Sequence, residues 1–196
     1  DDDIHKAVND WCSNPNKAVN MYGHIHDWDT SQVTKMNHLF SGKNRFNNDI
    51  SRWDVSDVEN MESMFHGASS FNGNINSWNT SKVINMAAMF DYATSFNQPI
   101  GWDVSNVENM EKMFYNASVF NQDISGWDTS NVTNINEMFK ECPINDNYKP
   151  QFSVTNNTNI QRQRTKERQA QENAQEKAYW DAQTKNSMER LLNNGE

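Results

Sequence analysis

The sequence predicts an α/β solenoid of about five coils, each built from a short helix and a short parallel strand. The first observation is a tryptophan that recurs at spacings of 25, 25, 24 and 25 residues, at Trp28, Trp53, Trp78, Trp102 and Trp127. The second is a phenylalanine in the same register, at Phe40, Phe65, Phe90, Phe114 and Phe139. A period of this length, held by apolar positions, is typical of repeat proteins. One such unit cannot bury its apolar side alone, so neighbouring coils are expected to stack.

Residues 1–27 are predicted to form an N-terminal helical cap. Ile4, Ala7, Val8 and Trp11 follow the spacing of a helix with one apolar face. We expect this helix to end at Asn14-Pro15, because the residue before a proline is disfavoured in the α region. Such a helix would cover the core that the open end of a solenoid exposes.

Residues 28–150 are predicted to form the five repeats. A serine stands at the expected start of each helix, at Ser31, Ser56, Ser81, Ser105 and Ser130. After Ser56, Glu59 completes a capping box. Met61, Met64 and Phe65 then fall on one helical face. The shorter segment after Phe71 is predicted to lead into a strand that pairs with its neighbours.

An asparagine follows the second phenylalanine in four of the repeats, at Asn47, Asn72, Asn97 and Asn121. We expect these side chains to be buried and to bond backbone groups of their own and adjacent coils. Replacing one by alanine would then leave buried groups unpaired, at a cost of roughly 1–3 kcal/mol.

The repeat Trp127-Asp128-Thr129-Ser130 … Met138-Phe139, with Phe120-Asn121-Gln122-Asp123-Ile124, resembles the BspA-like leucine-rich-repeat surface proteins. The resemblance covers residues 20–142. The segment from Trp11 to Ile25 is similar to the caps of algal members of that group. The resemblance implies a right-handed leucine-rich-repeat solenoid, no catalysis, and an interaction role that is secreted or at a surface. A secreted, cell-surface or organelle-lumen location is therefore favoured over the cytosol, although the sequence does not fix the compartment.

The composition changes after Pro150. Residues 151–159 are predicted to be a polar linker, and residues 160–196 a C-terminal helical arm, because that stretch up to Asn193 is free of glycine and proline. Three alternatives are open for the arm: it folds back on the solenoid, it docks in a partner's groove, or it is disordered. Its partner-docking residues would be Ala170, Ala174, Ala178, Trp180, Met188, Leu191 and Leu192.

Charge argues against a nucleic-acid partner. Residues 1–156 hold 10 basic and 20 acidic residues, a net charge of −10, whereas residues 157–196 hold 7 and 6, a net charge of +1. An acidic repeat region is poorly suited to phosphate contacts. No apolar run reaches the 18 residues of a membrane span. Cys12 and Cys142 flank the repeats and are expected to lie beyond disulfide reach.

No catalytic residues, cofactor or metal site are predicted. His24 and His26 are the histidines closest together in the sequence and could bind a metal ion. We favour the alternative that they only form hydrogen bonds with backbone groups at the junction of cap and repeats. The series Asp29, Asp54, Asp103 and Asp128 could bind calcium, but turn capping by the carboxyls explains the same spacing and is favoured.

Two functions fit this sequence. The first is a non-catalytic binding module, whose polar face suits contacts with a protein or a glycan. The residues of that face would be Asp49, Ser51, Asn74, Asn76, Gln98, Asp123 and Ser125. The alternative is a scaffold subunit of a large multiprotein assembly, anchored by its C-terminal helix.

Overall fold

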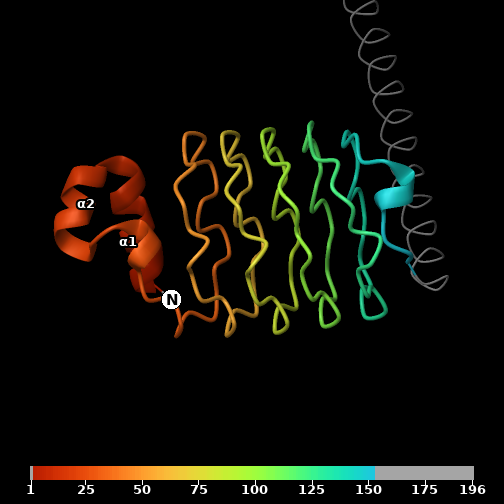
Figure 1. Ribbon diagram of the computed structural model, residues 1–196, viewed down its shortest axis with the longest axis horizontal. Coiled ribbons are helices and arrows are strands. Elements are labelled where there is room, and N and C mark those ends of the chain that lie inside the picture. The colour runs from red at the N-terminus through yellow and green to blue at the C-terminus, as the bar shows by residue number, and fades with distance from the viewer. Residues whose placement is uncertain (1, 153–196) are drawn as a thin grey trace, which may run out of the picture. The chain divides into compact units, whose positions relative to one another are not determined.

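The computed structural model describes residues 2–152. Two α-helices, α1 (Asp2–Ser13) and α2 (Pro15–Tyr22), open the chain. Two short 3-10 helices, η1 (Ile25–Asp27) and η2 (Asp146–Tyr148), stand before and after the repeats. Between them the chain runs in coils that lie side by side, one for each repeat (Figure 1). The chain divides into units 1–156 and 157–196, so everything described belongs to the first unit.

Several predicted segments are not tested by this structure. The helical arm over 160–196 and all but the first two residues of the linker over 151–159 lie outside the described residues. The predicted domain boundaries at residues 27, 150 and 159 stay predictions.

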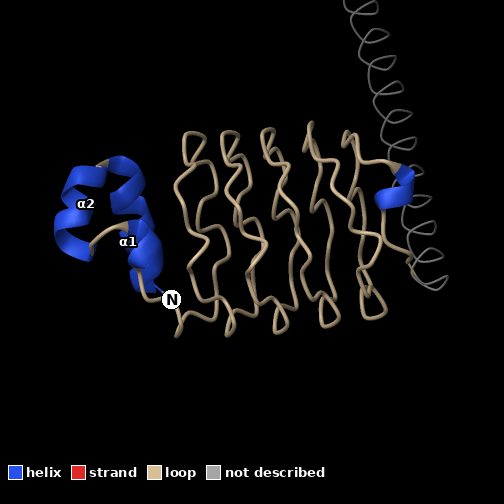
Figure 2. Cartoon of the chain, in the orientation of Figure 1, coloured by secondary structure: helices blue, strands red, loops and turns tan. Residues whose placement is uncertain are grey.

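The predicted α/β fold class is wrong. Within residues 28–145 the repeats contain no helix, and residues 2–152 contain no extended strand, so the coils are not strand-plus-helix units (Figure 2). The physical reason is a residue with a left-handed backbone in the middle of each predicted helix, with φ between 53° and 58°. These residues are His38, Ser63, Ala88, Lys112 and Glu137. A right-handed helix cannot pass through such a residue.

The backbone of the predicted helix bonds to the next coil instead of to itself. In the second coil, the N–H of Met61 donates to the carbonyl of Asn85 at 2.9 Å, and that of Phe65 donates to Met89 at 2.9 Å. Parallel pairing is limited to isolated bridges, such as Asn60 with Asn85. Intervening N–H groups close short turns, as Met64 does on Met61. Backbone polar groups are thus paired without regular secondary structure.

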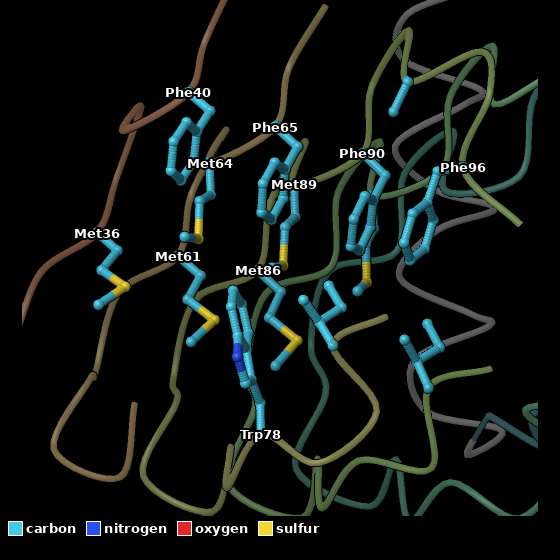
Figure 3. Close-up of a cluster of buried hydrophobic side chains, with 14 of the residues drawn as sticks. Met36, Phe40, Met61, Met64, Phe65, Trp78, Met86, Met89, Phe90 and Phe96 are labelled. Atoms are coloured by element: carbon cyan, nitrogen blue, oxygen red, sulfur yellow. The ribbon is translucent and has the colours of Figure 1, made fainter. Parts of the chain in front are cut away.

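The core is a single cluster that runs through all the coils, as predicted. Phe65 stacks on Phe40 at a ring-centroid distance of 5.4 Å and on Phe90 at 5.5 Å, with the rings nearly parallel. Within the second coil, Phe65 also stacks on Phe71 at 4.0 Å. Methionines form parallel rows beside these rings (Figure 3). Phe65 is therefore covered on both sides, which stabilises the stack through apolar burial and ring contacts.

Buried polar groups link the coils across this core. The indole N–H groups of Trp53, Trp78, Trp102 and Trp127 donate to carbonyls of the preceding segment, namely those of Ile25, Ile50, Ile75 and Ile100. In the other direction, the buried hydroxyl of Thr80 donates to the carbonyl of Asp103 at 2.8 Å. These bonds satisfy the polar ends of the buried side chains.

The first helix, α1, packs on the first coil. The buried face of α1 is the predicted one, made by Ile4, Ala7, Val8 and Trp11, and α1 ends at Ser13 as predicted. His5 bonds the carbonyl of Asn37 at 2.8 Å, and the indole of Trp11 donates to Asn48 at 3.1 Å. The second helix, α2, was not predicted; Pro15 at its start and the side chain of Asn14 as its N-cap explain it.

Candidate functional site

The predicted polar face is solvent-accessible and ordered in rows. Asp49, Asn74, Asn76, Asp123 and Ser125 are exposed, and Ser51 and Gln98 are half-buried. Equivalent residues of adjacent coils lie in register because the coils themselves are stacked (Figure 1). We call the row formed by these seven residues the polar face.

Tight turns fix the side chains of the polar face. The carboxylate of Asp49 accepts the N–H of Ser51 at 2.9 Å, and that of Asp123 accepts the N–H of Ser125 at 3.0 Å. Asn74 makes the same turn with Asn76. The N–H of Ser51 holds the pKa of Asp49 below the usual range for an aspartate, and the hydroxyl of Ser125, together with its N–H, does the same for Asp123. The two carboxyls are therefore charged at neutral pH.

The structure brings three predicted residues together around one shallow hollow. Asp49, Ser51 and Asn74 line a space of about 390 Å³, whose other walls are Asn47, Asn48, Asn72 and Gly73. Gln98 lies beside it and donates to Asn72 at 3.2 Å. Asp123 and Ser125 belong to a later coil and do not line the hollow. The hollow presents amide and carboxylate groups, which suit hydrogen bonds to a polar ligand.

The asparagine row beside the hollow corrects one expectation. Each side-chain oxygen accepts the N–H of the equivalent asparagine one coil further, as Asn47 does from Asn72 at 2.9 Å and Asn72 from Asn97 at 3.0 Å. However, Asn47, Asn72 and Asn121 are exposed rather than buried. Water can replace a lost bond there, so the alanine cost is smaller than expected for a buried group.

Turn capping explains the regular aspartate series, as predicted. Asp29, Asp54, Asp103 and Asp128 each accept the N–H of the serine two residues on, at 2.9–3.1 Å. Asn79 makes the same bond to Ser81 in the third coil. Because the amide oxygen of Asn79 accepts the same hydrogen bond as an aspartate carboxylate, this turn does not depend on the negative charge.

Sequence reasoning missed a second cluster of polar and aromatic side chains, which lies around the exposed Tyr92. Tyr92 is 48% exposed, and its ring lies 6.4 Å from that of His66 and 5.8 Å from that of Tyr115. Nearby, His66 bonds the buried Asp91 at 3.1 Å. The signal was present in the sequence: the position of Asp91 holds a different residue in every coil, namely Ser41, His66, Asp91, Tyr115 and Lys140. Such variation marks positions that the repeat does not require for folding.

Three predicted features remain: the docking residues of the arm, the histidine pair and the two cysteines. The docking residues from Ala170 to Leu192 lie outside the described residues. At the cap junction, the rings of His24 and His26 stack at 5.6 Å, and His26 contacts Asp27 at 3.0 Å. Within residues 2–152, no three His, Cys, Asp or Glu side chains are grouped to hold a metal ion. Cys12 and Cys142 are free thiols, as predicted, and burial raises the pKa of both.

Comparison with known proteins gives one result. The family described as "Mycoplasma protein of unknown function, DUF285" matches the chain twice, over residues 10–101 and 101–196. No curated protein and no solved structure matches significantly. In the described part of the chain, no helix has the length and apolar character needed to cross a membrane.

Proposed function

Since the chain belongs to the DUF285 family, whose description assigns no function, we propose that it is a non-catalytic binding module. We further propose that it acts in the manner of the BspA-like surface proteins that its repeats resemble. The double family match agrees with a repeat protein of this kind. The BspA-like assignment itself, the surface location and the absence of catalysis are parts of this proposal.

The observation that carries the proposal is the preorganisation of the polar face. Asp49 and Asn74 occupy equivalent places on adjacent coils, and each is fixed by a bond to the backbone two residues on. The asparagine row fixes the hollow from the other side. A surface that is already ordered loses little conformational entropy on binding.

The chemistry of the polar face favours a partner rich in hydrogen-bond donors. Its carboxylates and amide oxygens accept bonds from backbone N–H groups, from hydroxyls or from cations. A protein segment is the first partner class that we propose, and a glycan is the second. Repeated acceptors at regular spacing suit an extended ligand, because stacked repeats form extended binding surfaces.

The test is binding by the intact chain to immobilised surface proteins and glycans of defined composition. The Asp49→Asn and Asp123→Asn double variant keeps both turns, since Asn74 makes the same turn in the second repeat. It removes two charges from the polar face, so binding should weaken. The control is Asp54→Asn with Asp103→Asn, which makes the same exchange in a different turn. Equal effects of the two pairs would contradict a role for the polar face.

The scaffold function needs a separate experiment, since its docking residues lie outside the described residues. Truncation after Pro150 removes them and leaves the described coils. Unchanged partner binding by the truncated chain supports the binding module. Loss of co-purification with a large assembly would favour the scaffold role instead.

A further inference from the structure

A pocket of about 570 Å³ lies between α1, the end of α2 and the first coil. Its apolar wall is formed by Ile4 and Ala7 of α1, by Tyr22, and by Trp28 and Val33 of the first coil. This volume is within the range of small-molecule sites, which are mostly apolar and carry a few polar groups. The pocket is separate from the polar face and shares no residue with its hollow.

The pocket exists because α1 covers the first coil less completely than one coil covers another. The valines equivalent to Val33 are fully buried, at Val58, Val83, Val107 and Val132. Val33 itself is only half-buried, and so is Trp28, although the tryptophans of the next four coils are at most 7% exposed. Trp28 stacks on Trp53 at 6.1 Å on the coil side. Apolar surface that a preceding coil would cover is thus left facing the pocket.

The charges around this apolar wall are unbalanced. Asp3, Lys6 and Asp29 line the pocket. Lys6 is already neutralised, because its ammonium lies 2.6 Å from the carboxylate of Asp10 and 3.0 Å from the hydroxyl of Tyr22. Among residues 2–152, no ion pair involves Asp3 or Asp29. Two carboxylates therefore border an apolar and aromatic wall without a cation to match them.

We propose that this pocket binds a small organic cation that joins an aromatic or branched apolar group to an ammonium. The apolar group would pack on Trp28, Val33 and Ile4, where water is displaced from apolar surface. The ammonium would lie by Asp3 and Asp29, and an aromatic wall also favours a cation. This site goes beyond the proposed function, because it recognises a free small molecule and not the partner of the polar face.

The test uses three probes with the same indole ring and different charge: tryptamine, its neutral alcohol analogue tryptophol, and indole-3-acetate. Binding to the intact chain is followed by the indole N–H resonance of Trp28 in two-dimensional NMR, identified with Trp28→Phe. Tryptamine should bind saturably, about threefold or more tighter than tryptophol, as expected for partly exposed ion pairs. Indole-3-acetate should bind weakest. Equal binding of tryptamine and indole-3-acetate would overturn the proposal.

Matched variants locate the probe. Asp29→Asn keeps its turn, as Asn79 shows for the equivalent position, and should remove much of the preference for tryptamine over tryptophol. Asp103→Asn makes the same change in a coil that does not line the pocket and should have no effect. Val33→Phe should fill the pocket and weaken both probes; if it unfolds the chain, Gln32→Tyr at an exposed lining position replaces it. Binding that survives a folded blocking variant would place the probe elsewhere. A basic peptide, acetyl-Trp-Lys-amide, that binds when tryptamine does not would also overturn the small-molecule assignment.

Discussion

The indole N–H of Trp102 donates to the carbonyl oxygen of Ile75, one coil earlier, at 3.0 Å. Trp102 is 4% exposed, so the bond lies in the core. The indole ring of Trp102 also stacks on that of Trp78, with a distance of 6.3 Å between the ring centroids. One residue thus joins two coils both by apolar contact and by a hydrogen bond.

We predict that Trp102→Phe lowers the free energy of unfolding by about 2–4 kcal/mol, because it removes a buried hydrogen bond and leaves a cavity in the core. The carbonyl of Ile75 then keeps only the N–H of Trp78, at 3.2 Å. The control is Trp28→Phe, since Trp28 is half-buried and its bond to Gly23 is exposed. That variant should cost less than about 1 kcal/mol. Urea denaturation measures both, and similar losses would show that the buried bond is unimportant.

Thr80→Val should be tolerated, although it deletes a hydrogen bond. The hydroxyl of Thr80 donates to the carbonyl of Asp103, but valine occupies the equivalent buried position at Val55 and Val104. The same backbone therefore accepts either residue, and the loss should stay near the net value of one hydrogen bond, about 1 kcal/mol. Thermal unfolding of Thr80→Val and of the reverse change Val104→Thr checks this. A loss of several kcal/mol would mean that the carbonyl of Asp103 depends on the hydroxyl.

Gly67→Ala should destabilise the protein by about 1–2 kcal/mol through backbone strain alone. Gly67 has φ of +65°, and an added Cβ would meet only the backbone of Gly42, at 3.8 Å and beyond. Gly126→Ala is the matched control, because Gly126 lacks a positive φ and has open space around it. Chemical denaturation should separate the two variants. A neutral Gly67→Ala would contradict the left-handed backbone assigned to this turn.

Asp91→Asn should stabilise the protein at neutral pH, by about 1 kcal/mol, because one buried carboxylate oxygen of Asp91 has no partner within the described residues. Burial raises the pKa of Asp91, an effect that His66 and Lys112 oppose. The folded state therefore holds this proton more tightly than the unfolded state, and stability is lost as pH rises through the raised pKa.

The difference in the free energy of unfolding between Asp91→Asn and the parent should accordingly shrink as pH falls. At low pH, Asp91 is protonated in both the folded and the unfolded state. Denaturation curves across the acidic range measure this difference. If this difference increased on acidification, the pKa of Asp91 in the folded protein would be lowered and not raised. Asp123→Asn serves as comparison, because turn bonds lower the pKa of Asp123 and its contribution should be lost as pH falls.

The sequence predicted the apolar positions better than the backbone that carries them. Phe65 and Met64 are buried as expected, because a strict period places equivalent side chains on each other whatever the local conformation. The helix prediction failed at Ser63, which has φ of 54°. Serine rarely adopts this left-handed conformation, so its presence in the sequence did not indicate a break in the helix. Gly42 and Gly67 were the visible hints of a left-handed turn.

The candidate site was predictable only in part. Asp49, Ser51 and Asn74 were expected on one face, and they line one hollow. Asp49 and Ser51 lie two residues apart on the same side of the first coil, and Asn74 is the equivalent of Asp49 in the next coil. The pocket at Trp28 and Val33 was not predicted. It depends on how far α1 extends over the first coil, which the spacing of Ile4 and Ala7 alone does not determine.

Backbone bonding between coils follows one rule from Met36 to Asn116. Four alternate N–H groups of each coil donate to the next coil, starting from Met36, Met61, Met86 and Met110 in turn. These four junctions consequently share the same pattern of backbone donors and acceptors. Duplicating or deleting one whole coil would lengthen or shorten the stack and keep this bonding pattern. The number of repeats therefore sets the length of the stack.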